Sequence, residues 1–136
     1  MTSKVDYIGS LRTRCVHLRS GNTIVTDAPV DNHGKGEAFS PTDLAATSLA
    51  CCMLTVMDIH AQGQGYSIDG ATAEVTKHMT AAPRRIGAVD IRLIMPAGQL
   101  FSEEQKRSLE RIARNCPVAL SLHPDIEQRI QWVWNG

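Results

Sequence analysis

The stretch that decides the fold is SPTDLAATSLACCMLTVMDIHAQG, residues 40–63, which predicts one long helix with two adjacent cysteines at its middle. Ser40 can cap this helix, Pro41 suits its first position, and Asp43 completes a weaker version of a capping box. Gly63 marks the end. Apolar residues spread around most of the helical circumference, so we expect a helix that is buried on nearly all sides: Leu44, Leu49, Met53, Leu54, Val56, Met57 and Ile59.

The whole chain has 136 residues and fits a single domain, residues 1–136. Fourteen basic residues balance fourteen acidic ones, so there is no overall charge to attract nucleic acid or an anionic membrane. The N-terminal residues lack the apolar core of a secretory signal, and the apolar run 44–57 is shorter than the about 20 residues of a membrane span. We therefore expect a cytoplasmic protein with no nucleic-acid or membrane partner, whose four cysteines are free thiols.

The remaining chain reads as an alternation of hairpins and helices. Residues 5–18 and 23–26 flank a Ser-Gly-Asn turn and predict a first hairpin, and the Pro- and Gly-containing residues 27–39 predict a loop before the central helix. A second hairpin is expected from residues 66–77 and 86–95, with a turn at 81–83.

The C-terminal third predicts a helix, a break and a strand. Ser102 to Gln105 form a capping box for a helix whose apolar positions, Leu109, Ile112 and Ala113, face inward. Pro117 ends that helix, a short helical turn covers 118–122, and residues 126–134 alternate as a final strand. The order ββ-α-ββ-α-β is an α+β layout.

The two adjacent cysteines cannot be partners. Successive helical residues point about 100° apart, and a disulfide between Cys51 and Cys52 would distort the backbone severely. Buried cysteines are commonly small core residues, and Cys15 in the first hairpin is most simply one of these. A reactive pair needs a second thiol from elsewhere, and Cys116, at the helix break before Pro117, is the candidate.

A reactive cysteine must be a thiolate, which requires a nearby cation, a helix N-terminus or a metal. Cys52 lies too far into its helix for help from the N-terminal dipole. A basic side chain must therefore stabilise it. Arg12, Arg14 and Arg19 lie on the first hairpin, and periodicity does not choose among them.

Three segments carry a family resemblance: TDAPVDNHGKGEAF before the helix, SPTDLAATSLACC within it, and ARNCPVALSL near the C-terminus. They resemble the osmotically inducible protein C and organic hydroperoxide resistance family (OsmC/Ohr), in its OsmC-like branch, over residues 7–134. The most specific features are the Ser-Pro-x-x-Leu helix start with a cysteine eleven residues after the proline, and the later Cys-Pro-Val. This family's fold agrees with the element order above, and it implies an intertwined homodimer.

The resemblance also implies site residues. The reactive cysteine is Cys52, the second cysteine is Cys116, and the family's arginine falls on Arg12, with Arg14 close behind. The hydroperoxide-resistance branch has a glutamate directly after the helix-starting proline, where it orients the arginine. This chain has Thr42 there, followed by Asp43 as a possible substitute, so we expect a less firmly held arginine. Cys51 is assigned to packing.

The implied activity is that of a thiol peroxidase without cofactor or metal. Cys52 reduces a hydroperoxide and becomes a sulfenic acid, Cys116 condenses with it to a disulfide, and an external dithiol resets the pair. Apolar neighbours favour an organic hydroperoxide over hydrogen peroxide: Leu49, Met53, Val56 and Phe39. The alternative is a non-enzymatic OsmC-like protein that binds a small ligand or senses redox state. A metal site built from Cys52, Cys116, His60 and His123 is a third reading.

Overall fold

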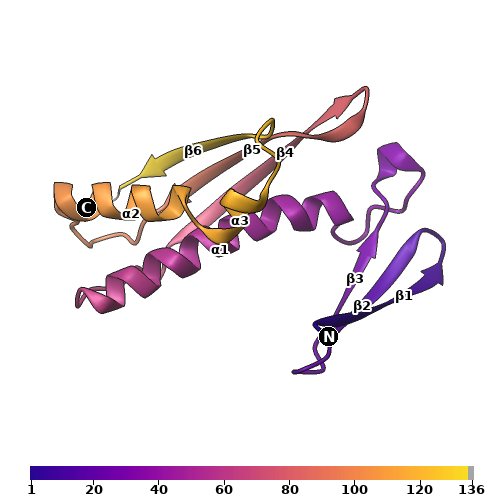
Figure 1. Cartoon of the computed structure of the whole chain (residues 1–136), viewed down its shortest axis with the longest axis horizontal. Helices are drawn as coiled ribbons and strands as arrows, with labels where there is room; N and C mark the ends of the chain where they lie inside the picture. Colours follow the sequence, from indigo (N-terminus) through magenta and orange to yellow (C-terminus); the bar gives the residue numbers. More distant parts are fainter. Residues whose placement is uncertain (135–136) are drawn as a thin grey trace. The chain divides into compact units, whose positions relative to one another are not determined.

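The computed structural model describes residues 1–134 of the chain. Its elements, labelled in Figure 1, are β1 (Ser3–Gly9), β2 (Arg12–His17), β3 (Thr23–Asp27), η1 (Val30–Asn32), α1 (Pro41–Gly63), β4 (Thr72–Ala81), β5 (Arg84–Ile94), α2 (Glu103–Arg114), α3 (Pro117–Ser121) and β6 (Glu127–Val133). The α+β class is confirmed. The described chain forms two compact units, which divide between Ala45 and Ala46, within α1. A single domain over 1–136 stays a prediction.

The N-terminal segment contains one strand more than the sequence predicts. Residues 5–18 were expected as a single strand, but β1 and β2 are separate and antiparallel. The chain reverses at Ser10 and Leu11, which have φ values of 57° and 61°. Residues other than glycine rarely adopt this left-handed backbone conformation. Serine and leucine are not residue types that indicate such a turn in a sequence.

The first unit is a three-stranded sheet in the order β1-β2-β3. Its register places Val5, Cys15 and Ile24 side by side on one face, and Tyr7 lies on the same face. Val5, Tyr7 and Ile24 are more than half exposed, and Cys15, expected in the core, is partly exposed. The buried residues before Ala46 are all polar: Thr26, Asp27 and Ser40. This sheet therefore has no apolar core of its own.

The second unit contains the sheet β4-β5-β6. β4 and β5 form the second predicted hairpin, in which Val75 pairs with Ile91, although β4 begins at Thr72 and not at Tyr66. β5 and β6 are parallel. Parallel neighbours need a crossover connection, and α2 and α3 supply it.

The predicted helix ends in this unit are confirmed. The Ser102 hydroxyl accepts a hydrogen bond from the Gln105 amide, and the Gln105 side chain accepts one from the Ser102 amide. α2 ends at Arg114, and Pro117 begins α3 as the sequence indicates. The crossover is thus defined by local capping and by proline.

α1 begins as predicted but is buried differently. The Asp43 amide donates to Ser40 Oγ at 3.1 Å and the Ser40 amide donates to Asp43 Oδ2 at 3.0 Å, which completes the expected box. The expectation of burial on nearly all sides is wrong for the isolated chain, because Ile59 is 67% exposed. The buried residues form one stripe at spacings of three and four: Ala46, Leu49, Ala50, Met53, Met57 and Ala61.

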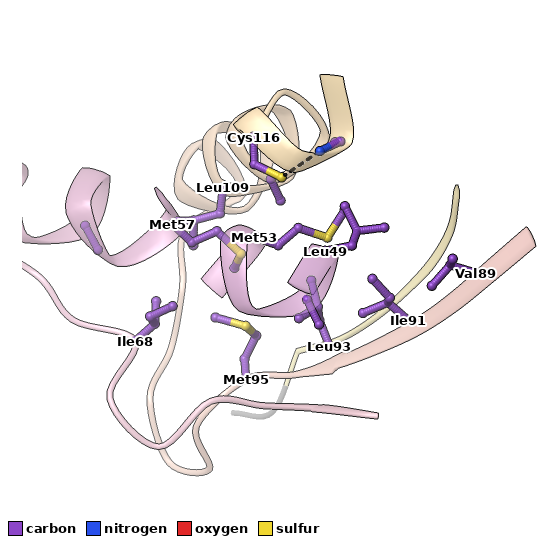
Figure 2. Packing of buried hydrophobic residues seen from close by; sticks show 14 of the residues in the cluster. Leu49, Met53, Met57, Ile68, Val89, Ile91, Leu93, Met95, Leu109 and Cys116 are labelled. Carbon is purple, nitrogen blue, oxygen red and sulfur yellow. Dashed lines mark hydrogen bonds between the residues drawn. The ribbon is translucent and has the colours of Figure 1, made fainter. Parts of the chain in front are cut away.

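The stripe on α1 forms the centre of the core. Figure 2 shows Leu49, Met53 and Met57 between Leu109 and Cys116 on one side and a group from β5 on the other. That group consists of Ile91, Leu93 and the following Met95, all about 1% exposed or less. α1 is therefore held from both the sheet and the crossover helices.

Helix α1 is also the one helix among the described residues that is long and apolar enough to cross a membrane, by length and composition alone. The apolar run 44–57 is shorter than a membrane span, but the predicted helix around it is not, since α1 has 23 residues. The core helix of a soluble protein passes the same test, and the buried stripe of α1 packs within the second unit.

Leu49 offers a direct test of this core, because its side chain is 0% exposed. Leu49→Ala should lower the free energy of unfolding by about 2–5 kcal/mol, through lost burial and the cavity it leaves. Urea unfolding followed by circular dichroism measures this change. The matched control is Leu100→Ala at a site 79% exposed, where a change within about 0.5 kcal/mol is expected. Equal effects of the two substitutions would contradict this packing.

Candidate functional site

The structure brings Cys52 and Cys116 together in the second unit. Cys52 lies in the middle of α1, is partly buried, and packs against the core cluster. Cys116 caps α3 and is 1% exposed. Both are free thiols, and Cys52 lies close enough to the Cys116 thiol to affect its pKa. Two neighbouring thiols can close into a disulfide after oxidation, provided that the sulfurs approach to about 2.05 Å.

The environment of Cys116 favours its protonated form. Burial raises the pKa of the Cys116 thiol above its ordinary value, and the neighbouring Cys52 raises it further. The Ala119 amide acts in the opposite direction, since it donates to Cys116 Sγ at 3.4 Å, the dashed line in Figure 2. Because a neutral thiol is a weak nucleophile, Cys116 is not the cysteine that is poised to attack first.

Two expectations about the surroundings of Cys52 are wrong. Cys51, assigned to packing, is exposed, because the turn of about 100° between successive helical residues places it on the opposite flank of the buried stripe from Cys52. Leu49 and Met53, expected to contact a substrate tail, are both 0% exposed inside the core. Phe39, expected beside them, is 53% exposed and belongs to the first unit.

Arg12 lies in the first unit, where it is held by a buried carboxylate. β2 and β3 place Arg12 directly opposite Asp27. Arg12 Nε donates to Asp27 Oδ1 at 2.7 Å and Nη2 donates to Oδ2 at 2.9 Å, a two-point fork. Asp27 is 1% exposed. The arginine lowers the pKa of the Asp27 carboxyl, and the carboxylate in turn raises the pKa of Arg12.

A loop brings a second acidic residue to this pair. Arg12 Nη2 also donates to Glu37 Oε2 at 3.2 Å, and the Glu37 amide donates to Asp27 Oδ2 at 3.1 Å. The loop reaches this position because Gly34 sits against Ala28, where an added Cβ would lie 1.7 Å from the Ala28 carbonyl oxygen. Only glycine fits at this position, so Gly34 allows the loop to follow the path that brings Glu37 to Arg12.

The expectation of a loosely held arginine is therefore wrong. Arg12 bonds instead to Asp27 and Glu37, which come from β3 and from the loop. The Thr42 hydroxyl lies 3.2 Å from Ser40 Oγ, and Asp43 caps the helix. Arg14 is exposed and faces Asp6 and Val25 in register. The placement of Arg12 beside Cys52 stays a prediction, because the two residues belong to different units.

Asp27 and Glu37 are functional candidates that the sequence interpretation missed. A signal was available only in part: a turn fixes the register of its hairpin, but equal counting from the expected Ser20–Asn22 turn pairs Arg12 with Val30, whereas the observed register pairs it with Asp27. The strand was expected to end at Thr26, which left Asp27 in the loop. The position of Glu37 depends on loop geometry and has no comparable signal.

Two surface hollows lie elsewhere in the second unit. One of about 400 Å³ covers the charged outer face of the sheet and is lined by residues that include Glu74, Asp90, Arg92 and Arg129. Another, of about 440 Å³, is lined by residues that include His60, Tyr66 and Gln105. Neither is lined by Cys52 or Cys116. Among residues 1–134 no group of three or more His, Cys, Asp or Glu side chains converges as metal ligands would.

Comparisons with known proteins agree with this fold. A search of curated proteins finds no match. A crystal structure from Psychrobacter arcticus 273-4, whose name associates it with osmotic stress and detoxification, is 53% identical with a TM-score of 0.92 and covers 97% of this chain and 95% of that one.

More distant structures share the fold alone. An organic hydroperoxide resistance protein OsmC from Legionella pneumophila is 15% identical, with a TM-score of 0.76 and coverage of 98% of this chain and 97% of that one. The organic hydroperoxide resistance protein OhrB of Bacillus subtilis is 16% identical, with a TM-score of 0.66 and coverage of 97% and 98%. The model of the OsmC-like protein family matches residues 34–130. This chain therefore belongs to the OsmC-like protein family.

Proposed function

We propose that this protein is a cysteine-based thiol peroxidase that reduces organic hydroperoxides in the cytoplasm. The observation that carries the proposal is that the free thiols of Cys52 and Cys116 are neighbours at one core cluster, within a chain of the OsmC-like family. Two structural relatives are named organic hydroperoxide resistance proteins, which supports the choice of substrate class.

The reaction begins at Cys52. Its thiolate, stabilised by Arg12, attacks the distal oxygen of the hydroperoxide, and the O–O bond breaks. The leaving alkoxide takes up a proton and departs as an alcohol, and Cys52 becomes a sulfenic acid. Arg12 is a suitable partner because its guanidinium stays protonated and can donate hydrogen bonds to a developing anion.

Cys116 resolves the sulfenic acid. Its sulfur attacks the Cys52 sulfur, the S–O bond breaks, water leaves, and a disulfide joins α1 to the N-cap of α3. An external dithiol then reduces this disulfide by exchange, and both thiols are restored. Because Cys116 is buried, the Cys52 sulfur is the group it can reach directly.

The pairing can be tested by titration. One equivalent of cumene hydroperoxide should convert the wild-type protein to a Cys52–Cys116 disulfide, and peptide mass spectrometry localises the bond. Cys52→Ser should abolish peroxide consumption, whereas the exposed Cys51→Ser should retain it. A bond involving Cys51, or no turnover with any peroxide and dithiol, would contradict the mechanism. The latter result would favour the non-enzymatic, ligand-binding or redox-sensing alternative.

The raised pKa of Cys116 predicts how the second step depends on pH. The attacking form is the thiolate, which is the minor form below the raised folded pKa, so each unit of pH gained should speed disulfide closure about tenfold. Rapid-quench mass spectrometry between pH 6 and 8 measures the lifetime of the Cys52 sulfenic acid. A lifetime that does not change with pH would show that Cys116 is already ionised.

We also propose that the protein works as a homodimer. The first unit has no buried apolar residue, although Val5, Tyr7 and Ile24 share one face of its sheet. On α1, Ile59 is likewise uncovered. Exposed apolar surfaces of this kind commonly mark protein interfaces. A second copy would bury them, as the family resemblance implies.

Sedimentation equilibrium at micromolar concentration should give twice the chain mass of 14.9 kDa. Ile24→Asp places a charge on the apolar face and should shift the equilibrium toward the monomer, because an unpaired charge is costly to bury. Thr72→Asp, at an exposed position of the second sheet, is the control. A wild-type protein that remains monomeric would contradict the dimer.

A further inference from the structure

We propose that Gln128 of β6 is a positioning residue that fixes α3, and with it the Cys116 thiol, beside Cys52. The inference rests on the proposed function, because it concerns the step in which Cys116 attacks the oxidised Cys52 sulfur. All three residues belong to the second unit.

Gln128 is a polar residue on the inner face of the second sheet. It lies beside Val89 of β5, which is 1% exposed. Two positions further along β6, Ile130 lies beside Ile91, which is also 1% exposed. Side chains two positions apart on a strand point to the same face, so Gln128 faces the core. An amide at such a position is costly unless it is hydrogen-bonded, and this requirement makes its partner informative.

The partner of Gln128 is the residue of α3 that also binds the thiol. Gln128 Nε2 donates to the Ala119 carbonyl oxygen at 3.0 Å. The Ala119 amide donates in turn to Cys116 Sγ at 3.4 Å, the dashed line in Figure 2. Within residues 1–134, the bond from Gln128 is the only hydrogen bond that joins α3 to a strand. Ala119 therefore connects β6 to the Cys116 thiol.

Helix α3 has little else to hold it in place. It contains five residues, whereas an isolated helix shorter than about 12–15 residues is marginal in water. Its one buried residue is Ala119, whose single methyl group contributes little apolar burial. Val118 is only partly buried against the core, and Leu120 is 69% exposed. The hydrogen bond from Gln128 is therefore a large part of what fixes the position of α3.

The position of α3 matters for one step of the proposed reaction. In that step the Cys116 sulfur forms a bond with the Cys52 sulfur, the S–O bond of the sulfenic acid breaks, and water leaves. The rate depends on how often the two sulfurs occupy the geometry of attack, which a fixed helix makes more frequent. Oxidation of Cys52 by the peroxide does not involve Cys116. Gln128 should therefore affect the second step and not the first.

A purely structural role for Gln128 predicts a different outcome. If its amide only satisfied a helix-end carbonyl, losing it would destabilise the dithiol and disulfide forms equally, and the equilibrium between them would not change. If Gln128 positions Cys116, its loss gives α3 more freedom in the dithiol form. Closing the disulfide then costs more conformational entropy, and the disulfide becomes easier to reduce.

The experiment measures the equilibrium of the Cys52–Cys116 disulfide with glutathione, in a Cys51→Ser background, by alkylation and peptide mass spectrometry. Gln128→Met keeps the length of the side chain and removes the donor. Gln131→Met is the matched control, because Gln131 lies on the outer face of the same strand and is exposed. The ratio [GSH]²/[GSSG] at the midpoint should fall about fivefold in Gln128→Met, the worth of one hydrogen bond, and should stay unchanged in the control.

Rapid-quench mass spectrometry with cumene hydroperoxide separates the two steps of the reaction. In Gln128→Met the Cys52 sulfenic acid should form at the wild-type rate and persist about fivefold longer. A sulfenic acid that forms more slowly but closes at the wild-type rate would contradict the positioning role.

The glutathione equilibrium needs no peroxide, so it separates this inference from the proposed function. An unchanged midpoint in Gln128→Met overturns the inference and leaves the peroxidase proposal intact. A lowered midpoint supports it even if the wild type consumes no peroxide, a result that would contradict the proposed function alone. A wild type that forms no Cys52–Cys116 disulfide overturns both. If far-ultraviolet circular dichroism shows that Gln128→Met does not fold, Gln128→Asn decides, because its shorter side chain does not reach Ala119, and an unchanged midpoint there overturns the inference.

Discussion

The second unit depends on one apolar contact, the burial of the α1 stripe against β5 and α2. Met53 is 0% exposed, so its direction is fixed toward the core. Successive helical positions turn by about 100°, which places Cys51 and Cys52 on opposite flanks of the stripe; Cys52, three positions after Leu49, lies on the flank that packs against the core, and Cys51 is exposed. The core packing therefore decides which of two adjacent cysteines meets Cys116, and no feature of the cysteines themselves is needed.

Local chemistry made much of this fold predictable. The capping box at Ser102 and Gln105 and the proline at 117 define helix ends by hydrogen bonds within a few residues, so the sequence contains all the relevant partners. The turn at Ser10 and Leu11 lacked such a signal. The burial of α1 was overestimated for a related reason. The sequence shows which positions of the helix are apolar, but distant segments of the chain and other chains determine which of these positions are covered.

The candidate site was predictable only in part. Cys52 and Cys116 followed from the family resemblance, and in the structure Cys52 packs against the core cluster that contains Cys116. The carboxylates beside Arg12 did not follow, because the resemblance directed attention to Thr42. A charge required near an arginine can come from any element that reaches it. Here the hairpin register supplies Asp27, and a glycine that packs against Ala28 supplies Glu37.

The two thiols differ in a way that orders the proposed chemistry. Cys116 is buried and its pKa is raised, so it is both shielded from an external oxidant and slow to react as a free thiol. Cys52 is the more exposed of the pair. A peroxide would therefore meet Cys52 first, and Cys116 would react only after oxidation had made the neighbouring sulfur electrophilic. Burial separates the two steps, since the core packing that keeps Cys116 protonated also holds it near the sulfur that it must attack.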